Sequence, residues 1–363
     1  MKIHFLGGFL GSGKTTAIIA AAKYLMSQGK TVGIITNDQG KYLVDTAFFR
    51  LADLPTVEVT GGCFCCHYGD LDEELSQLID RLHPDVIFAE SVGSCADLIA
   101  TVIRPMAEYR ESSSVPSSYS VIVDGRLLKL LLDGDELPFS ENVSYIFEKQ
   151  IEESGLLVIN KMDLIPASER ESLLQSAEAY FSGKVILAQN SLNEDSIRAW
   201  VSLIETEGTA VPEKTLELDY EKYGAGEADL AWLDQRLFFT GTQKTGREFV
   251  ITLLSSIENS IRQRGYPIGH LKAELMAGPI HAKLSFVALE TPGWEELIPA
   301  LPTGQPISLL LNGRVQCTAN ALQTLVDSVL QQVLQKYSVT MVEDGRDVFN
   351  PGFPNPTHRL GGK

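Results

Sequence analysis

The segment GFLGSGKT, residues 8–15, constrains the fold of this chain more than any other feature. It matches the pattern GxxxxGK(S/T) and stands between an apolar run at residues 2–6 and helical spacing at residues 15–28. A glycine-rich loop between a strand and a helix is the context in which this pattern forms a phosphate-binding loop. The sequence therefore predicts that the chain begins with a nucleotide-binding α/β domain.

The distribution of apolar residues extends this prediction over the first two-thirds of the chain. Short apolar runs that end in Gly, Asp or Asn alternate with amphipathic stretches. Such alternation is typical of a parallel sheet covered by helices, whose ligands bind at the carboxyl ends of the strands. We therefore expect a P-loop NTPase fold, with a mostly parallel sheet and helices on both faces. The strands are expected at residues 2–6, 31–36, 57–60, 86–89, 120–123, 156–159 and 185–187, and the helices at residues 15–28, 70–82 and 168–181.

A smaller α+β domain is expected after the first domain. A polar stretch containing VPEKT and YEKYGAGEAD indicates a linker. Strand and helix patterns then resume, and the final residues are rich in Pro and Gly, which favours irregular structure. Strands are expected at residues 236–240, 268–275, 280–289, 307–311 and 339–342, and helices at residues 245–264 and 319–336. The predicted boundaries are 1–210 for the nucleotide-binding domain, 211–235 for the linker, 236–345 for the α+β domain and 346–363 for an irregular tail.

The composition excludes some classes of partner. The net charge is −17 and the pI is about 4.8, which argues against a nucleic-acid or anionic-membrane surface because those need clustered Lys and Arg. No apolar run is long enough to span a bilayer. The apolar N-terminal stretch is interrupted by GSGKTT, which is unlike a secretory signal. Three of five cysteines lie within four residues, unlike a disulfide framework, so we expect a cytoplasmic protein.

The phosphate loop suggests a role for each of its residue types. Glycines let backbone N–H groups turn toward phosphate oxygens, and the positive end of the following helix favours the same charge. Lys14 is expected to reach the β- and γ-phosphates, and the Thr15 hydroxyl to bind Mg²⁺. The residues expected to contact the nucleotide phosphates are Gly8, Gly11, Ser12, Gly13, Lys14, Thr15 and Thr16.

A second motif, NKMD at residues 160–163, indicates which base is bound. The Asp163 carboxylate can accept hydrogen bonds from N1–H and the exocyclic amine of guanine, whereas adenine presents an acceptor at N1. The stem of Lys161 can lie against the purine face, and Asn160 completes the predicted base site. Alternatively, the aspartate only caps a helix in a surface loop. We expect GTP and GDP as ligands.

Two further strand ends supply acidic candidates. Glu90 closes the strand at residues 86–89, where phosphate-loop enzymes hold Mg²⁺, and Gly93 lets its N–H approach the γ-phosphate. Asn37–Gly40 is placed to form a switch loop, in which Asp38 is a candidate to orient the attacking water. Asp45 is a further candidate, and either aspartate is equally compatible with a solvated loop. The predicted catalytic residues are Lys14, Asp38 and Glu90.

The crowded cysteines Cys63, Cys65 and Cys66 follow the strand at residues 57–60. Three thiolates can occupy three positions of a tetrahedral Zn²⁺ site and leave the fourth for a carboxylate, His, water or an incoming ligand. Thiolates also bind Cu(I), and Co²⁺ or Ni²⁺ where that ion is available. The adjacent His67 is either a ligand or a solvent-facing residue, and the alternatives to metal binding are inert buried thiols or a redox pair. Two cysteines outside the cluster, Cys95 and Cys317, are interpreted as small buried apolar residues.

In this order, GGFLGSGKTT, GGCFCC, ESVG and NKMD resemble the CobW-like family of metal-chaperone GTPases, and the resemblance covers about two hundred residues. It implies GTP hydrolysis, slow without a partner, a transition metal at the cysteines, a client metalloprotein and, in some members, a homodimer. The chain departs from the family at Val92, where a Thr is usual, and at Asp38, where a Glu is usual. Members often have a histidine-rich run, but here only His270 and His281 lie in the second domain, and we interpret both as structural.

Three functions remain compatible with the sequence. The first is a GTPase that couples nucleotide state to the binding and delivery of Zn, Co or Ni, because the cysteines lie between two candidate switch segments. The second is a GTP-driven assembly chaperone for a corrinoid or other cofactor enzyme, in which the cysteines are structural. The third is a P-loop kinase for a small molecule, which the guanine motif disfavours.

Overall fold

The computed structural model describes residues 1–38, 40, 49, 52–110, 116–206, 211, 212, 214–241, 246–290, 293–302 and 304–361. The chain divides into two compact units. The first unit contains the chain up to Gly224, apart from residues 40–44, together with the chain from Pro354 on; the second contains Ala225–Phe353. Among the described residues, no helix has both the length and the apolar character needed to cross a membrane.

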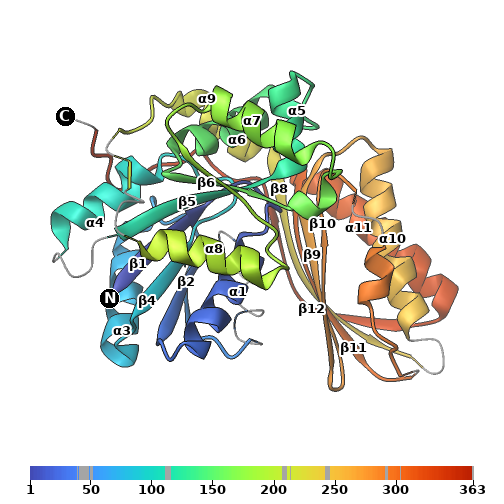
Figure 1. Ribbon diagram of the computed structural model, residues 1–363. Coiled ribbons are helices and arrows are strands. Elements are labelled where there is room, and N and C mark those ends of the chain that lie inside the picture. The colour runs from blue at the N-terminus through green and yellow to red at the C-terminus, as the bar shows by residue number, and fades with distance from the viewer. Residues whose placement is uncertain are drawn as a thin grey trace. The chain divides into compact units, whose positions relative to one another are not determined.

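The first unit is built on a sheet of seven parallel strands (Figure 1). The strands are β1 (Lys2–Gly7), β2 (Val32–Asp38), β3 (Thr56–Thr60), β4 (Val86–Glu90), β5 (Pro116–Asp124), β6 (Leu156–Asn160) and β7 (Val185–Ala188). Their order is β3-β2-β4-β1-β5-β6-β7, so β1 is central and pairs with β4 and β5. All seven strands were predicted from their apolar runs. β2, β3 and β4 lie on one side of β1, and β5, β6 and β7 lie on the other. The strand order therefore changes direction at β1, and such sheets bind ligands in the loops next to that point, here the loop after β1.

Helices cover both faces of this sheet. On one face, strand residues such as Leu6, Phe88 and Val158 share a core with Ile18 of α1 and Trp200 of α8. On the other face α3 packs so closely that a Cβ added at a β2 glycine would lie 3.0 Å from a leucine of α3. The predicted α/β fold class is therefore confirmed. The helices are α1 (Lys14–Ser27), α3 (Tyr68–Leu82), α4 (Arg104–Tyr109), α5 (Gly125–Asp133), α6 (Glu141–Glu153), α7 (Arg170–Tyr180), α8 (Glu194–Glu205) and α9 (Tyr220–Ala228), with a π-helical turn at Ile99–Ile103 before α4.

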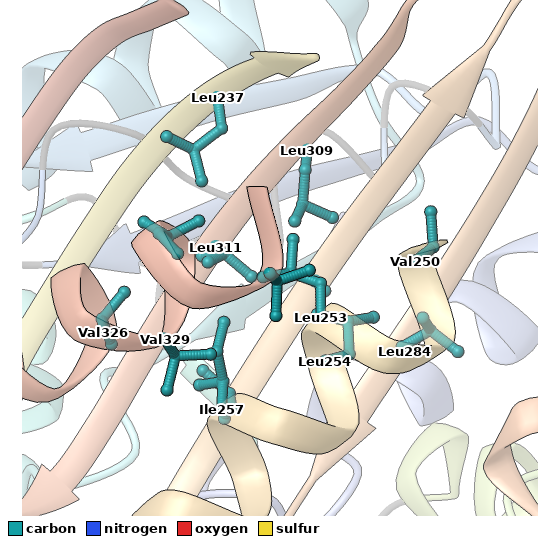
Figure 2. Close-up of a cluster of buried hydrophobic side chains, with 14 of the residues drawn as sticks. Leu237, Val250, Leu253, Leu254, Ile257, Leu284, Leu309, Leu311, Val326 and Val329 are labelled. Atoms are coloured by element: carbon teal, nitrogen blue, oxygen red, sulfur yellow. The ribbon is translucent and has the colours of Figure 1, made fainter. Parts of the chain in front are cut away.

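The second unit is an antiparallel α+β structure. It contains β8 (Leu230–Thr240), α10 (Arg247–Gln263), β9 (Ile268–Ala277), β10 (Ile280–Phe286), β11 (Ile307–Gln316), α11 (Ala319–Tyr337) and β12 (Thr340–Phe349). The sheet order is β10-β9-β11-β8-β12. Figure 2 shows α10 and α11 against the sheet, where Leu253 and Ile257 of α10 meet Val329 of α11 and Leu311 of β11. Alternate strand residues and helix faces thus form one apolar core.

Three elements occupy parts of the predicted linker and the predicted irregular tail, and one of them, α9, lies wholly inside the linker. β8 begins at Leu230, inside the predicted linker, and β12 continues to Phe349, inside the predicted tail. Both strands contain polar residues whose partners are on other strands: Asp234 accepts a hydrogen bond from Asn312, and Gln235 donates one to Glu343 at 3.1 Å. Because these partners are distant in sequence, the polar residues resemble a linker when the sequence is considered alone.

Candidate functional site

The phosphate loop (residues 8–15) joins β1 to α1 at the carboxyl edge of the parallel sheet. Gly8, Gly11 and Gly13 have φ values of 125°, 71° and 100°, a region that favours glycine. A Cβ at Gly8 would lie 2.1 Å from the carbonyl oxygen of Ile122, and one at Gly13 would lie 2.5 Å from Asn160 Nδ2. The loop therefore has the backbone that a phosphate cradle needs, and larger residues do not fit at these two positions.

Two side chains of the loop are arranged for an anionic ligand. Lys14 is buried, and its Nζ donates to the carbonyl oxygens of Gly8 at 2.6 Å and Phe9 at 3.3 Å. Among the described residues, the buried Ser12 hydroxyl has no hydrogen-bond partner. A buried polar group without a partner costs about 1–3 kcal/mol, which a phosphate oxygen can offset. Thr16 follows on α1 and is half-buried.

The predicted Mg²⁺ ligands lie side by side. Glu90 is the last residue of β4, which pairs with β1, and Thr15 is in the first turn of α1. The Thr15 hydroxyl donates to Glu90 Oε1 at 2.8 Å, and both side chains are buried. A hydroxyl and a carboxylate are oxygen ligands of the kind that Mg²⁺ prefers, so these two residues fit the ion. Asp38 ends β2 beside Thr60, but its side chain lies outside the described residues, as do Gln39 and Asp45.

Asn160 connects the predicted base-binding motif to the phosphate loop. This residue ends β6, and its Nδ2 donates to the carbonyl oxygen of Ser12 at 2.8 Å. Its Oδ1 accepts hydrogen bonds from the Ser191 N–H at 3.0 Å and from the Ser191 hydroxyl at 2.9 Å. One buried amide therefore positions three segments: the phosphate loop, the NKMD segment and the loop after β7.

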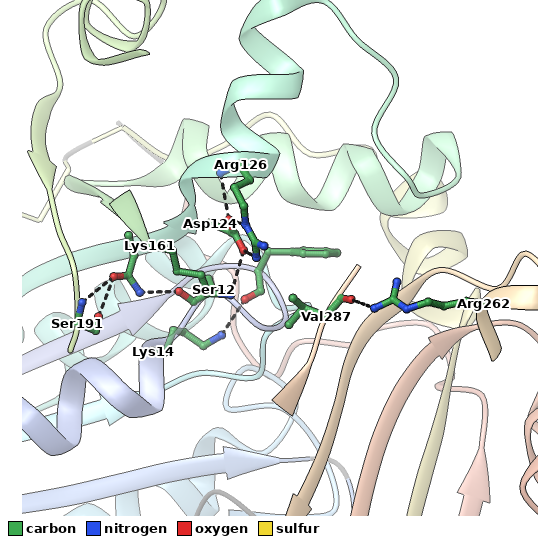
Figure 3. A network of polar contacts seen from close by, with 10 residues as sticks. Ser12, Lys14, Asp124, Arg126, Lys161, Ser191, Arg262 and Val287 are labelled. Carbon is green, nitrogen blue, oxygen red and sulfur yellow. Dashed lines mark hydrogen bonds and ion pairs between the residues drawn. The ribbon is translucent and has the colours of Figure 1, made fainter. Parts of the chain in front are cut away.

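The two charged residues of NKMD lie in different environments. Lys161 has a φ of 60°, and its Nζ donates to Asp124 Oδ2 at 2.9 Å. Burial alone would raise the pKa of Asp124, but Arg126, which bonds the same carboxylate at 2.7 Å, and Lys161 hold that pKa below its ordinary value (Figure 3). Asp163 lies in the short helical turn Met162–Leu164 and is exposed. Its carboxylate is thus open to a ligand, while the Lys161 ammonium is held by an ion pair.

Sequence reasoning missed several residues around the base site. Asp124 is the last residue of β5 and Arg126 lies in the first turn of α5, while Gln189 and Ser191 follow β7. The Gln189 carbonyl accepts the Met162 N–H at 3.1 Å, which joins the two loops. A usable signal was present, because polar residues directly after parallel strands gather at one edge of the sheet.

The cysteine loop (residues 61–67) connects β3 to α3 and brings three sulfurs together. The carbonyl oxygen of Cys63 accepts N–H groups from Cys66 and His67, both at 3.0 Å, which curls the chain into a tight turn. The Sγ atoms of Cys63 and Cys65 are 2.8 Å apart, those of Cys63 and Cys66 3.2 Å, and those of Cys65 and Cys66 3.8 Å. All three sulfurs therefore converge on a volume that one metal ion can occupy.

The three thiols differ in burial and acidity. Cys63 and Cys65 are buried, and Cys66 is partly exposed. Hydrogen bonding with Cys65 and Cys66 holds the pKa of Cys63 well below its ordinary value. Hydrogen bonding with Cys63 raises the pKa of Cys65, and that of Cys66 to about 11. The thiol of Cys63 therefore has the lowest pKa of the three.

Asn37 links the cysteine loop to the end of β2. Its buried Nδ2 donates to the carbonyl oxygens of Val59 at 3.1 Å and Gly62 at 2.6 Å, and its Oδ1 accepts the Phe64 N–H at 2.8 Å. One side chain therefore satisfies three backbone groups on both sides of Cys63. Since Asn37 begins the segment predicted to sense the γ-phosphate, it joins that segment to the thiols.

Among the described residues, the side chains that gather closely enough to hold one metal ion are Cys63, Cys65 and Cys66, and no histidine is among them. The His67 Nδ1 bonds Asp70 at 3.0 Å, and His67 is not among the His, Cys, Asp and Glu side chains that gather within 4.8 Å of one another. In the second unit, the His270 Nε2 bonds Asn312 Oδ1 at 2.9 Å, and His281 is exposed on β10. The described geometry gives His67 and His270 hydrogen-bonding partners rather than a shared site.

Cys95 lies in the loop after β4, close to the thiol cluster. Its side chain is buried and makes hydrogen-bonding contact with the thiols of Cys63 and Cys65. Sequence analysis interpreted it as an apolar residue, and that interpretation missed the thiol contacts. Cys317, also predicted to be buried, is partly exposed.

The same loop is held between the phosphate loop and α6. A Cβ at Gly93 would lie 2.7 Å from Leu10 Cδ2 and 3.1 Å from its Cα, so the backbone here packs directly on the phosphate loop. The Gln150 Nε2 donates to the carbonyl oxygens of Gly93 at 3.0 Å and Cys95 at 2.8 Å. A displacement at Gly93 would therefore reach Cys95 within two residues.

The terminal segment (residues 354–361) has no helix or strand, yet it packs on the cysteine loop. The Thr357 N–H donates to the Cys65 carbonyl at 2.9 Å, and its hydroxyl donates to the Cys66 carbonyl at 3.0 Å. The Asn355 N–H donates to Cys66 Sγ at 3.3 Å. Sequence composition predicted irregular backbone here but gave no indication of these contacts.

A buried carboxylate fixes the end of this segment. Asp97 is fully buried with a φ of 65°, and its Oδ2 accepts from Arg359 Nε and from the Tyr220 hydroxyl, both at 2.7 Å. Burial raises the pKa of Asp97, and these two hydrogen bonds oppose that rise. Since Asp97 is two residues after Cys95, the terminal segment contacts both the cysteine loop and the loop after β4.

Comparison with known proteins places this site in a family. The family model described as "CobW/HypB/UreG, nucleotide-binding domain" matches residues 2–188. The zinc chaperone CobW of a Sinorhizobium species is 29% identical over 199 residues, which cover 49% of this chain and 55% of that protein. The zinc chaperone YeiR of Escherichia coli is 29% identical over 177 residues, covering 47% of this chain and 49% of YeiR. The chain thus spans about half the length of these two curated relatives.

Two further proteins are similar over more of their own length. The urease accessory protein UreG of Metallosphaera sedula is 29% identical over 231 residues, which cover 58% of this chain and 89% of UreG. The structure of the Zn(II)-bound YjiA GTPase from E. coli aligns over 91% of this chain and 98% of its own, with 12% identity and a TM-score of 0.38. Because the family model spans residues 2–188 of 363, from β1 to β7, this chain belongs to the CobW/HypB/UreG family.

Proposed function

We propose that this protein binds and hydrolyses GTP and that its nucleotide state controls the binding of a transition metal, Zn²⁺ or alternatively Co²⁺ or Ni²⁺, for delivery to a client metalloprotein. One observation supports this function above all others. The sulfurs of Cys63, Cys65 and Cys66 converge on a loop that follows β3, and Asn37 hydrogen-bonds this loop to the end of β2. The cysteine loop and the phosphate loop thus lie at the same edge of the parallel sheet. The names of the relatives CobW and YeiR, both zinc chaperones, support it.

For the nucleotide, the proposal gives each described residue a role. The phosphate-loop amides and the Ser12 hydroxyl hold the phosphates, and Lys14 leaves the carbonyls of Gly8 and Phe9 to contact the β- and γ-phosphates. A Mg²⁺ ion held by Thr15 and Glu90 supplies neutralisation of phosphate charge when it is bound. Asp38 is proposed to orient the attacking water.

For the base, the exposed Asp163 carboxylate is proposed to select guanine. It can accept two hydrogen bonds from the Watson–Crick edge of guanine, whereas adenine would place an acceptor against it. The Asp124 pair keeps Lys161 close to the sheet edge, where its methylene stem can cover the purine face. GTP is therefore expected to bind at least about a hundredfold more tightly than ATP, since buried acceptors facing each other are strongly disfavoured.

For the metal, coupling follows from the contacts. Loss of the γ-phosphate releases the segments that contact it, which here are proposed to be the end of β2 and the loop at Gly93. The first segment is bonded to the cysteine loop through Asn37, and the second holds Cys95. Nucleotide and metal affinities must then change together, because linkage between two sites is reciprocal.

A second function is favoured by one observation. Cys63 and Cys65 are buried, as expected of a structural metal site or of inert thiols in an assembly chaperone for a cofactor enzyme. In that case a bound metal would not exchange, and nucleotide state would leave it in place.

Elemental analysis of protein purified without tags or chelators tests the proposed function. We expect about one transition-metal ion per chain, lost in the triple substitution Cys63/Cys65/Cys66→Ser and retained in Cys317→Ser. GTP hydrolysis should survive the triple substitution. Absence of bound metal after exposure to Zn²⁺, or hydrolysis of ATP in preference to GTP, would contradict the proposal. Metal that is bound but does not exchange with added chelator in either nucleotide state would favour the assembly chaperone.

A further inference from the structure

Cys95 brings a fourth thiol to the cluster from a separate element. The other three cysteines lie on the loop between β3 and α3, whereas Cys95 follows β4. Its side chain is 1% exposed and contacts the thiols of Cys63 and Cys65. It is not part of the group whose sulfurs all lie within 4.8 Å of one another, and the two thiols that it contacts are those of Cys63 and Cys65, not that of Cys66.

This arrangement is suited to a tetrahedral thiolate site. With Zn–S bonds of about 2.3 Å, the sulfurs of a tetrahedral site lie about 3.8 Å apart. The Cys65–Cys66 separation is already 3.8 Å, and the separations of 2.8 and 3.2 Å at Cys63 can open to that value around a bound ion. A loop segment of four residues supplies three corners of the tetrahedron, and a ligand from a second element supplies the fourth.

Other candidates for the fourth position are less well placed. His67 is bonded to Asp70 and lies outside the thiol group. Water can fill an open position, but Cys95 is 1% exposed and already contacts the thiols of Cys63 and Cys65. A thiol directed at two other thiols in an interior is a strong ligand for a thiophilic ion once it is deprotonated, and metal binding drives that deprotonation.

Resting on the proposed function, we propose that Cys95 is the fourth thiolate ligand of the transferred metal ion, and that the loop after β4 brings it to the site. The coordination sphere is then completed by a residue two positions after Gly93, in the segment proposed to contact the γ-phosphate. Gln150 donates to the carbonyl oxygens of Gly93 and Cys95, so these two residues move together. A change at the γ-phosphate can thus add or withdraw one metal–sulfur bond, which is a direct way for nucleotide state to set metal affinity.

X-ray absorption spectroscopy of the full-length protein loaded with Zn²⁺ alone, under reducing conditions, tests this inference. Four Zn–S bonds at about 2.3 Å are expected in the wild-type protein, and three with one lighter ligand in Cys95→Ser. The Co²⁺-loaded protein should lose about a quarter of its thiolate-to-metal charge-transfer absorption in Cys95→Ser, because that intensity follows the number of thiolates. The matched control Cys317→Ser should keep both spectra unchanged.

The outcomes separate this inference from the proposed function. If the wild-type protein binds one Zn²⁺ through three sulfurs, and Cys95→Ser leaves the spectra unchanged, the inference is overturned while the proposed function stands. If the wild-type protein binds no Zn²⁺, both fail. The wild-type sulfur count decides the question even if Cys95→Ser does not fold. In a folded Cys95→Ser, competition with a chelator should show at least about tenfold weaker Zn²⁺ binding, since loss of an outer-shell partner alone costs 10–100-fold.

Discussion

Replacing Asn37 with alanine should weaken both the fold and the metal site. The substitution removes three hydrogen bonds, to the carbonyls of Val59 and Gly62 and from the Phe64 N–H. Each such bond contributes about 0.5–1.5 kcal/mol net, and buried backbone groups left without partners add to the loss, so we expect about 2–5 kcal/mol. Domains are typically stable by about 5–15 kcal/mol, so the variant should remain folded at low temperature.

The effect on metal should exceed what general destabilisation produces. With its anchor to β2 gone, the cysteine loop no longer holds Cys63 in one place, and Zn²⁺ affinity should fall about 10–100-fold, as for other supporting contacts of metal ligands. Denaturant unfolding gives the stability, and competition with a chelator gives the affinity in GTP- and GDP-loaded protein. The nucleotide dependence of that affinity should shrink as well, since Asn37 is the proposed connection.

Asn193→Ala is the matched control. Asn193 caps α8 by accepting the Ser196 N–H at 2.9 Å, and loss of such a cap costs about 1 kcal/mol. This variant should be destabilised but bind Zn²⁺ normally. If Asn37→Ala is destabilised and yet keeps the wild-type affinity and its nucleotide dependence, Asn37 does not connect the two sites and the reasoning is refuted.

Three further predictions follow from other contacts. Gly8→Ala should abolish GTP binding in calorimetric titration, because φ is 125° and the new Cβ would lie 2.1 Å from a backbone oxygen. The control Gly134→Ala, where φ is 76° and the space is open, should bind GTP normally. Normal binding by both variants would show that the phosphate loop needs no glycine at position 8. Arg359→Ala leaves the buried Asp97 carboxylate without its cation, and should lower the free energy of unfolding by about 1–3 kcal/mol. The same variant should release Zn²⁺ to a chelator faster than the wild-type protein. An unchanged rate of release would show that the terminal segment does not restrain the cysteine loop. Burial raises the pKa of Glu153 to about 8, so the folded chain holds a proton that the unfolded chain releases above about pH 4.5. The free energy of unfolding should therefore fall as the pH rises between these two values, by up to about 1.4 kcal/mol per pH unit. Glu153→Gln should flatten this slope when denaturation is measured at several pH values. An equal slope in both proteins would place the titration elsewhere.

The parallel sheet could be predicted because its strands are locally distinct. A run such as LLVIN in β6 is entirely buried, and its apolar character is visible without knowing its neighbours. β8 could not be delimited in the same way, since Asp234 and Gln235 are accommodated by partners on β11 and β12 that are far away in sequence. The predicted strand boundaries therefore followed the local apolar content of the sequence. They were wrong where the polar residues of a strand are satisfied by tertiary contacts.

The candidate site was predicted unevenly for the same reason. Phosphate-loop and NKMD residues form contiguous patterns with known chemistry, and the structure places Asn160 within 2.8 Å of the phosphate loop. Cys95 and the terminal segment belong to no such pattern. Thr357 contacts Cys65 from almost three hundred residues away, and only the folded chain shows that contact. Cys95 could have been suspected, because both it and the cysteine loop follow carboxyl ends of parallel strands.

Nucleotide state and metal binding are proposed to be coupled through the end of β2 and the loop after β4. The most direct test is the Zn²⁺ affinity of the wild-type protein, measured by chelator competition with Mg²⁺ and either a non-hydrolysable GTP analogue or GDP. The two affinities should differ by at least about fivefold, the lower end of typical coupling energies. Equal affinities in the two states would contradict this coupling.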